Sequence, residues 1–244
     1  MENGSRVGES GPVDPEDRLI LRAERFSDAF GLLLVLLLAT CALSSLLGDS
    51  GWPAVLTLAF SGLTSAVALI GSHSPRRLVL AGAGLAAVAL VLGAVAAASG
   101  ADLWLNLAGV ITVILFAASA AAVLMRVLTS DEVTTRTIVG ALSVYILIGI
   151  LFSALYVTLN RIEDGAFFAG HVTLGHGDFL FFSVTTLTTT GYGDLVPAGQ
   201  PGEMIAALEM IIGPAFLLTL VARLVSLWRP GEGLVRRRER REAR

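Results

Sequence analysis

Apolar residues along this chain are gathered into blocks of about twenty positions that hold almost no charge. A helix needs about twenty apolar residues to cross a hydrocarbon core of about 30 Å. The pattern predicts six membrane-spanning helices, at residues 29–47, 53–71, 78–98, 104–125, 138–159 and 204–227. A shorter apolar stretch, 178–190, lies between the last two blocks and fits a re-entrant segment better than a seventh span.

The composition also indicates a membrane protein. Hydrophobic residues make up 55% of the 244 positions and charged residues only 15%, whereas soluble domains average about a quarter charged. Orientation follows from basic residues in the loops, not from the formal net charge of -3. Arginines precede the first span, separate the second from the third and the fourth from the fifth, and follow the sixth. We therefore expect a multi-pass protein of the cell membrane, with both termini cytoplasmic and residues 160–203 outside.

The chain is expected to fall into four regions. Residues 1–28 are polar and predict a cytoplasmic N-terminal tail, with a short surface helix from Asp17 to Asp28. Residues 29–128 predict a four-helix transmembrane bundle, and residues 130–228 hold the last two spans and the re-entrant segment. Residues 229–244 predict a basic cytoplasmic tail. Near a membrane, each of its arginines can add about 1 kcal/mol of attraction to anionic lipid; a solvated orientation signal is the alternative. No nucleic-acid partner is expected.

The segment Thr189-Thr190-Gly191-Tyr192-Gly193 follows the re-entrant stretch on the expected outer side. Removing water from a potassium ion requires several oxygen ligands at once, and a ring of backbone carbonyls from four chains can supply them. Glycine at 191 and 193 suits a backbone whose carbonyls all face one axis, because glycine adopts positive φ without a Cβ clash. We expect residues 189–193 to form a selectivity filter, with K+ bound at the carbonyls of the first four.

The residues that flank this segment are expected to orient and support it. Asp178 can cap a pore helix ending near residue 188, whose partly negative C-terminal end would stabilise a cation below it. Thr185 and Thr186 on that helix, and Asp194 directly after the filter, are expected to support the filter from behind; attraction of cations to the outer mouth is the alternative role of the Asp194 carboxylate.

Residues 138–228 resemble the two-helix pore module of bacterial potassium channels through the run from Phe181 to Asp194, which ends in Thr-Thr-Gly-Tyr-Gly-Asp. The resemblance covers under half of the chain. It implies a homotetramer around one central pore, a water-filled cavity below the filter and gating by the inner helices. Many relatives have Val where this chain has Thr190, and some have Glu in place of Thr185, so Asp194 is expected to be braced differently here.

With this resemblance, the expected fold class is an all-α polytopic membrane protein: six transmembrane helices plus a re-entrant pore helix and filter, in a tetrameric pore. Residues 130–228 become its pore domain. Within the last span, Pro214 removes a helix hydrogen bond and predicts a kink. Similar channels bend near the position of Gly213, so Gly213 and Pro214 are expected to form a gating hinge, with a static kink as the alternative. The expected apolar cavity wall consists of Leu217, Leu220, Val221 and Leu224.

Glu209 is the only acidic residue deep inside any predicted span. An ionisable group at such a position suggests a function by default. We expect its carboxyl group to accept hydrogen bonds from pore-helix hydroxyls such as Thr185 or Thr186 and so to support the filter. A neutral, purely structural carboxyl group is the alternative.

The predicted function is passive, potassium-selective conduction by a homotetramer that holds K+ in its filter and needs no cofactor. A weakly selective cation channel and a non-conducting regulatory or structural subunit are the alternatives. A voltage sensor requires repeated arginines in the fourth span, but residues 104–125 contain none and Arg126 stands alone after them. An Arg-ladder sensor is therefore not expected. An enzyme is disfavoured because no nucleophile, base and orienting group converge in the sequence.

Overall fold

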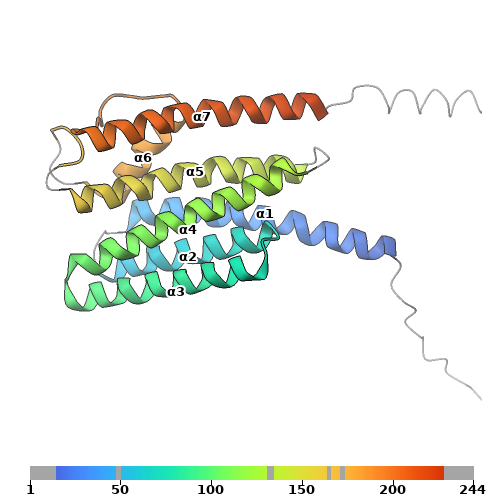
Figure 1. Cartoon of the computed structure of the whole chain (residues 1–244), viewed down its shortest axis with the longest axis horizontal. Helices are drawn as coiled ribbons and strands as arrows, with labels where there is room; N and C mark the ends of the chain where they lie inside the picture. The colour runs from blue at the N-terminus through green and yellow to red at the C-terminus, as the bar shows by residue number, and fades with distance from the viewer. Residues whose placement is uncertain (1–14, 48–50, 131–134, 164–165, 171–173, 228–244) are drawn as a thin grey trace, which may run out of the picture.

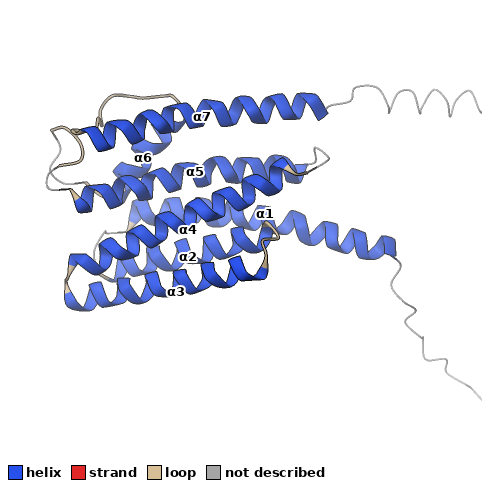
Figure 2. Ribbon diagram, in the orientation of Figure 1, coloured by secondary structure: helices blue, strands red, loops and turns tan. Residues whose placement is uncertain are grey.

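The structure is a computed structural model that describes residues 15–47, 51–130, 135–163, 166–170 and 174–227; the side chains at 15–29, 135, 136, 224 and 227 lie outside the description. The helices of this part are α1 (Pro15–Leu46), α2 (Trp52–Gly71), α3 (Arg76–Ser99), α4 (Asp102–Leu128), α5 (Thr135–Ile162), α6 (His176–Leu187) and α7 (Gln200–Leu227). Figure 2 shows helices and loops but no strand among these residues. The all-α prediction is confirmed.

Five of the described helices are long and apolar enough to cross a membrane: α2, α3, α4, α5 and α7. The apolar part of α1, Phe30–Leu46, is shorter; at 1.5 Å per residue it covers about 26 Å, so a span at 29–47 stays a prediction. Helix α1 begins at Pro15, so the surface helix expected from Asp17 to Asp28 is continuous with this apolar part. The predicted tail is thus helical over its second half.

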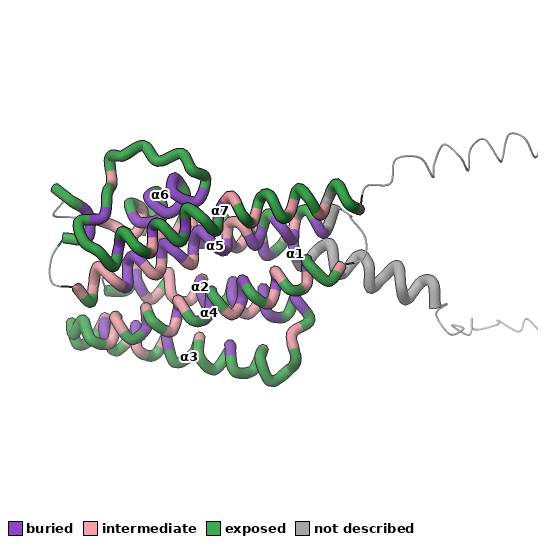
Figure 3. Tube along the Cα trace, turned by 45° about the horizontal axis from the view of Figure 1, so that its top comes forward, coloured by how far each residue is buried: buried purple, intermediate pink, exposed green. Residues whose placement is uncertain are grey.

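The helices pack in layers, with α7 at one edge and α3 at the other (Figure 1). Helix α5 lies between them and is contacted by α1 and α4 on one side and by α6 and α7 on the other. Within the single chain, the bundle therefore contacts α5 through α1 and α4. Figure 3 shows that α3 and α7 are mostly exposed whereas α5 is largely buried. Exposed apolar surface on spanning helices is available for lipid or for other chains.

Short connections alternate between the two ends of the helices. The α3–α4 turn and the segment around α6 lie at one end, and the α2–α3 turn and the α4–α5 connection lie at the other (Figure 1). Arg76 begins α3 and Arg126 stands in the last turn of α4, so both lie at the end opposite α6. Arg161, in the last turn of α5, lies at the α6 end instead.

Candidate functional site

Helix α6 is the predicted pore helix, and it begins two residues earlier than expected. Gly175 is its N-cap, and Asp178 lies in the first turn, so the expectation that Asp178 is the N-cap was wrong. Its Oδ2 accepts a hydrogen bond from the Gly175 N–H at 2.9 Å. A carboxylate in the first turn satisfies a backbone donor and interacts favourably with the helix dipole. Asp178 thus fixes where α6 begins.

The backbone of the predicted filter bends directly back onto α6. The N–H groups of Thr190 and Gly191 both donate to the Thr185 carbonyl oxygen, at 2.8 and 3.1 Å. Thr189, Gly191 and Gly193 have φ values of 58°, 49° and 82°, in or next to the left-handed region that only glycine adopts readily. Every second residue of the segment therefore has positive φ.

This hydrogen-bond pattern sets the direction of two carbonyl groups. In a planar trans peptide group, the C=O of one residue points opposite to the N–H of the next, and no described peptide bond is cis. The two N–H groups face α6, so the carbonyls of Thr189 and Thr190 point away from α6. Residues 189–193 are all exposed in the single chain. Oxygens arranged this way are available to an ion or to other subunits.

Side chains of the filter segment contact α6 as well. The Tyr192 ring stacks on Phe181, with centroids 5.8 Å apart and planes at 4°. The Thr190 hydroxyl lies 2.9 Å from that of Thr188, a contact that Val at 190 would lack. Asp194 is exposed beyond the segment. These contacts hold the segment against its own helix, while the assigned ion-binding and support roles stay predictions.

Glu209 is fully buried, with 0% of its surface exposed. Its Oε2 accepts a hydrogen bond from the Tyr156 hydroxyl at 2.6 Å, and its Oε1 lies 2.5 Å from the Ser183 hydroxyl. The sequence named Thr185 or Thr186 as partners; the structure places Ser183 there instead, because the Thr185 hydroxyl donates to Phe182 of its own helix at 3.0 Å. The expected helix was right and the expected residue was wrong.

The Glu209 contacts join three helices behind the filter. Tyr156 comes from α5, Ser183 from α6 and Glu209 from α7. An aromatic cluster surrounds the tyrosine, with ring centroids 5.1 to 6.2 Å from its own, formed by Phe152, Phe167 and Phe182. Sequence reasoning missed Tyr156, although a tyrosine in an apolar span needs a partner for its hydroxyl and Glu209 is the acid available there.

The C-terminal end of α6 is held by α5 and α7. The Tyr145 hydroxyl donates to the Leu187 carbonyl oxygen at 3.1 Å, which satisfies one of the free carbonyls at the helix end. Gly213 is buried against the same group: a Cβ at this position would meet the Leu187 carbonyl oxygen at less than van der Waals separation. Close packing therefore requires glycine at 213, and the hinge role of Gly213 and Pro214 stays a prediction.

Replacing Gly213 by Ala is expected to destabilise the assembled protein by about 1–3 kcal/mol per chain, because the added methyl group forces α7 away from α6. Thermal unfolding of the detergent-solubilised protein measures this. Gly84→Ala in α3 is the matched control, since a Cβ there meets nothing within 4 Å. Equal melting temperatures for the two variants would contradict the close-packing explanation.

The predicted cavity residues, which all lie after Gly213 in α7, have different surroundings. Leu217 and Val221 are exposed in the single chain, whereas Leu220 lines an apolar groove against α4 together with Leu124. The side chain of Leu224 lies outside the described residues. It therefore stays a prediction that these four residues line a pore cavity. The sequence did not suggest the contact of Leu220 with the groove against α4.

Comparisons with known proteins agree with this geometry. The family model described as "Ion channel" matches residues 164–229, from the loop before α6 to beyond the end of α7. "Two-pore potassium channel 1" of Arabidopsis thaliana is 36% identical over 95 residues, which are 37% of this chain and 24% of that protein. "Two pore potassium channel a" of Oryza sativa subsp. japonica is 34% identical over 83 residues, 34% of this chain and 22% of that protein.

These matches support a potassium channel family. They also support an ion channel over an enzyme, and with the spanning helices they support a multi-pass membrane protein. The chain spans about a quarter of the length of the curated relatives that it matches. No solved structure matches it. The relatives are plant proteins, so the resemblance to bacterial channels in particular stays a prediction.

Proposed function

We propose that four copies of this chain form a potassium-selective channel whose filter is residues 189–193 of each copy. The observation that carries the proposal is the backbone of this segment: the Thr190 and Gly191 N–H groups bond to Thr185, so the preceding carbonyls point away from α6. Rings of such carbonyls can replace the hydration shell of K+. The family match and the named plant relatives support the same ion.

Assembly around an axis is part of the proposal because one chain supplies too few oxygens to surround an ion. The filter residues are exposed in the single chain, and so are large apolar residues of α7, among them Leu208, Ile211 and Leu218. A fourfold arrangement would bring the filters together and cover part of this apolar surface. Lipid at the basic C-terminal tail is a further proposed partner.

The proposed orientation puts the filter outside and both termini in the cytoplasm. Arg76 and Arg126 lie at the end opposite α6, and arginine-rich ends face the cytoplasm. Gating is proposed to act on α7 at Gly213 and Pro214, without an Arg-ladder voltage sensor, since Arg126 is the one arginine of α4 and stands in its last turn. Through the contacts of α1 and α4 with α5, a movement of the bundle could reach the proposed pore.

Reconstitution into liposomes with a potassium gradient opposed by sodium tests the function. A reversal potential close to the potassium equilibrium value is the expected result. An intermediate value would mean a weakly selective cation channel, and absence of current from a correctly assembled protein would mean a non-conducting subunit. Either outcome would overturn potassium-selective conduction.

A further inference from the structure

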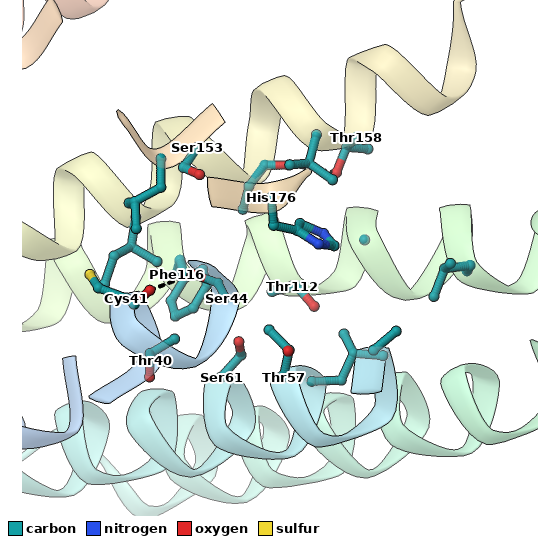
Figure 4. A pocket seen from close by; sticks show the side chains of 18 of the residues that line it. Thr40, Cys41, Ser44, Thr57, Ser61, Thr112, Phe116, Ser153, Thr158 and His176 are labelled. Atoms are coloured by element: carbon teal, nitrogen blue, oxygen red, sulfur yellow. Dashed lines mark hydrogen bonds between the residues drawn. The ribbon is translucent and has the colours of Figure 1, made fainter. Parts of the chain in front are cut away.

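A cavity lies between the four-helix bundle and the pore helices, away from the filter (Figure 4). Its walls come from α1, α2, α4, α5 and α6, and its volume is about 80 Å³. A water molecule needs about 10–15 Å³ measured in this way, so the cavity has room for on the order of five waters or for one small organic molecule. It joins the bundle to the part of the chain that holds the filter.

Several wall residues are threonines whose hydroxyl protons are already donated to backbone carbonyl oxygens. Thr40 donates to Leu36 at 2.8 Å, Thr112 to Ala108 at 2.8 Å and Thr158 to Ala154 at 2.7 Å, in each case one helical turn back. A hydroxyl has one proton and two acceptor lone pairs. These side chains therefore offer hydrogen-bond acceptors, not donors, to whatever occupies the cavity.

Two serines give the cavity unused hydrogen-bonding capacity. Ser61 of α2 is 5% exposed and Ser153 of α5 is 8% exposed, and among the described residues neither has a hydrogen-bond partner. Figure 4 shows both hydroxyl groups within the cavity, on facing walls. Buried polar groups are normally paired, and neither hydroxyl is among the fully enclosed atoms without a partner, so both are open to the cavity and bond to its occupant, whether water or a ligand.

The rest of the wall restricts the charge of the occupant. The lining contains no carboxylate, and Arg161 and His176 stand at one part of it, which disfavours a cation. The acceptor-rich threonines disfavour an anion over most of the surface. Phe116, Val157 and Leu180 add apolar contact area. A neutral molecule with a hydrogen-bond donor and a short apolar body fits all three conditions.

We propose that this cavity is a binding site for a small neutral amphiphile of the alcohol or amide class, whose donor group bonds between Ser61 and Ser153. Leu180 and His176 belong to α6, the helix on which the filter segment bends back. An occupant therefore contacts the bundle and the pore helix together. Binding of a ligand at this site does not depend on which ion the pore selects. It can therefore be measured separately from conduction.

A four-carbon primary alcohol that carries a diazirine tests the site by photolabelling the full-length protein in lipid nanodiscs. Mass spectrometry is expected to find adducts on wall peptides of α2 and α5, suppressed by excess 1-butanol. Ser61→Ala and Ser153→Ala are each expected to lower this competable labelling roughly twofold to tenfold, the effect of losing one hydrogen bond. Ala154→Leu, which adds bulk to a cavity wall residue next to Ser153 in the chain, is expected to abolish it.

Ser143→Ala is the matched control, a buried serine of α5 that does not line the cavity and bonds to Val139 of its own helix. Its labelling is expected to equal that of the unaltered protein. The proposal is overturned if labelling stays on lipid-facing positions of α3, resists 1-butanol, or is the same in the Ser61, Ser153 and Ala154 variants as in the control. Any of these results would mean a cavity occupied by water alone.

Discussion

Replacing Gly191 by Ala is expected to abolish potassium-selective current. Gly191 has a φ of 49°, and a residue with a Cβ loses roughly 1–2 kcal/mol in this left-handed region. Four copies meet at the proposed filter, so the strain acts four times at one ion site. Relief of the strain would rotate the peptide groups whose carbonyls are proposed to bind the ion. Reversal potentials in potassium and sodium gradients, with flux of each ion, measure the effect.

Gly170→Ala is the control for this substitution. Gly170 also has positive φ, 78°, and open space around its Cβ direction, but it lies in the loop before α6. It is expected to keep both current and selectivity, because the same backbone strain there touches no ion. Selective current through the Gly191→Ala protein would contradict the assignment of residues 189–193 as the filter. Loss of current in both proteins would point to misfolding.

Replacing Glu209 by Leu is expected to remove current and to destabilise the assembled protein, whereas Gln is expected to be tolerated. Leu leaves the buried Tyr156 hydroxyl without its partner, at a cost of about 1–3 kcal/mol per chain. The Ser183 hydroxyl lies 2.8 Å from the Gly149 carbonyl oxygen and 2.5 Å from Glu209, and it has one proton for the two. A neutral side chain at position 209 that donates a hydrogen bond to the Ser183 hydroxyl completes this network. The amide group of glutamine can donate this bond.

Thermal unfolding and flux of the Leu and Gln proteins provide the measurement. Glu203→Gln is the matched control, since Glu203 is exposed in the first turn of the same helix and its side chain bonds only to Gln200 among the described residues. If Gln at 209 proved as damaging as Leu, the negative charge and not the hydrogen bonding would be what the site requires. If neither change had an effect, Glu209 would have no role in support of the filter.

Local chemistry made the backbone of residues 189–193 partly predictable from sequence. The turn from α6 into residues 189–193 depends on neighbours within a few positions, with glycine at two of the three residues of positive φ. Charge-free blocks likewise located α2 to α5 and α7 to within a few residues. The boundary of α6 was missed by two residues because Asp178 supports the helix from its first turn instead of from the capping position.

Long-range partners were less predictable because they depend on how helices are rotated against one another. Ser183 and Thr185 lie two positions apart on α6, and only the observed rotation brings Ser183 to Glu209. The contact of Gly213 with Leu187 likewise requires the distance between two helices, which a sequence pattern does not contain. The apolar block of α1 predicted a membrane span, but the apolar part of the helix is too short to settle whether α1 crosses the membrane.

Helix α7 is fixed on both sides of Gly213. Glu209 anchors it to α5 and α6, and near the opposite end the half-buried Arg223 donates to the Ser130 carbonyl oxygen at 2.6 Å. Ser130 lies two residues beyond the end of α4. For α7 to pivot at Gly213, the Arg223 bond must either break or pull the end of the bundle with it. If α7 bends there during gating, as we propose, the movement is coupled to the first four helices, and a change in their packing is expected to alter opening without any contact with an ion.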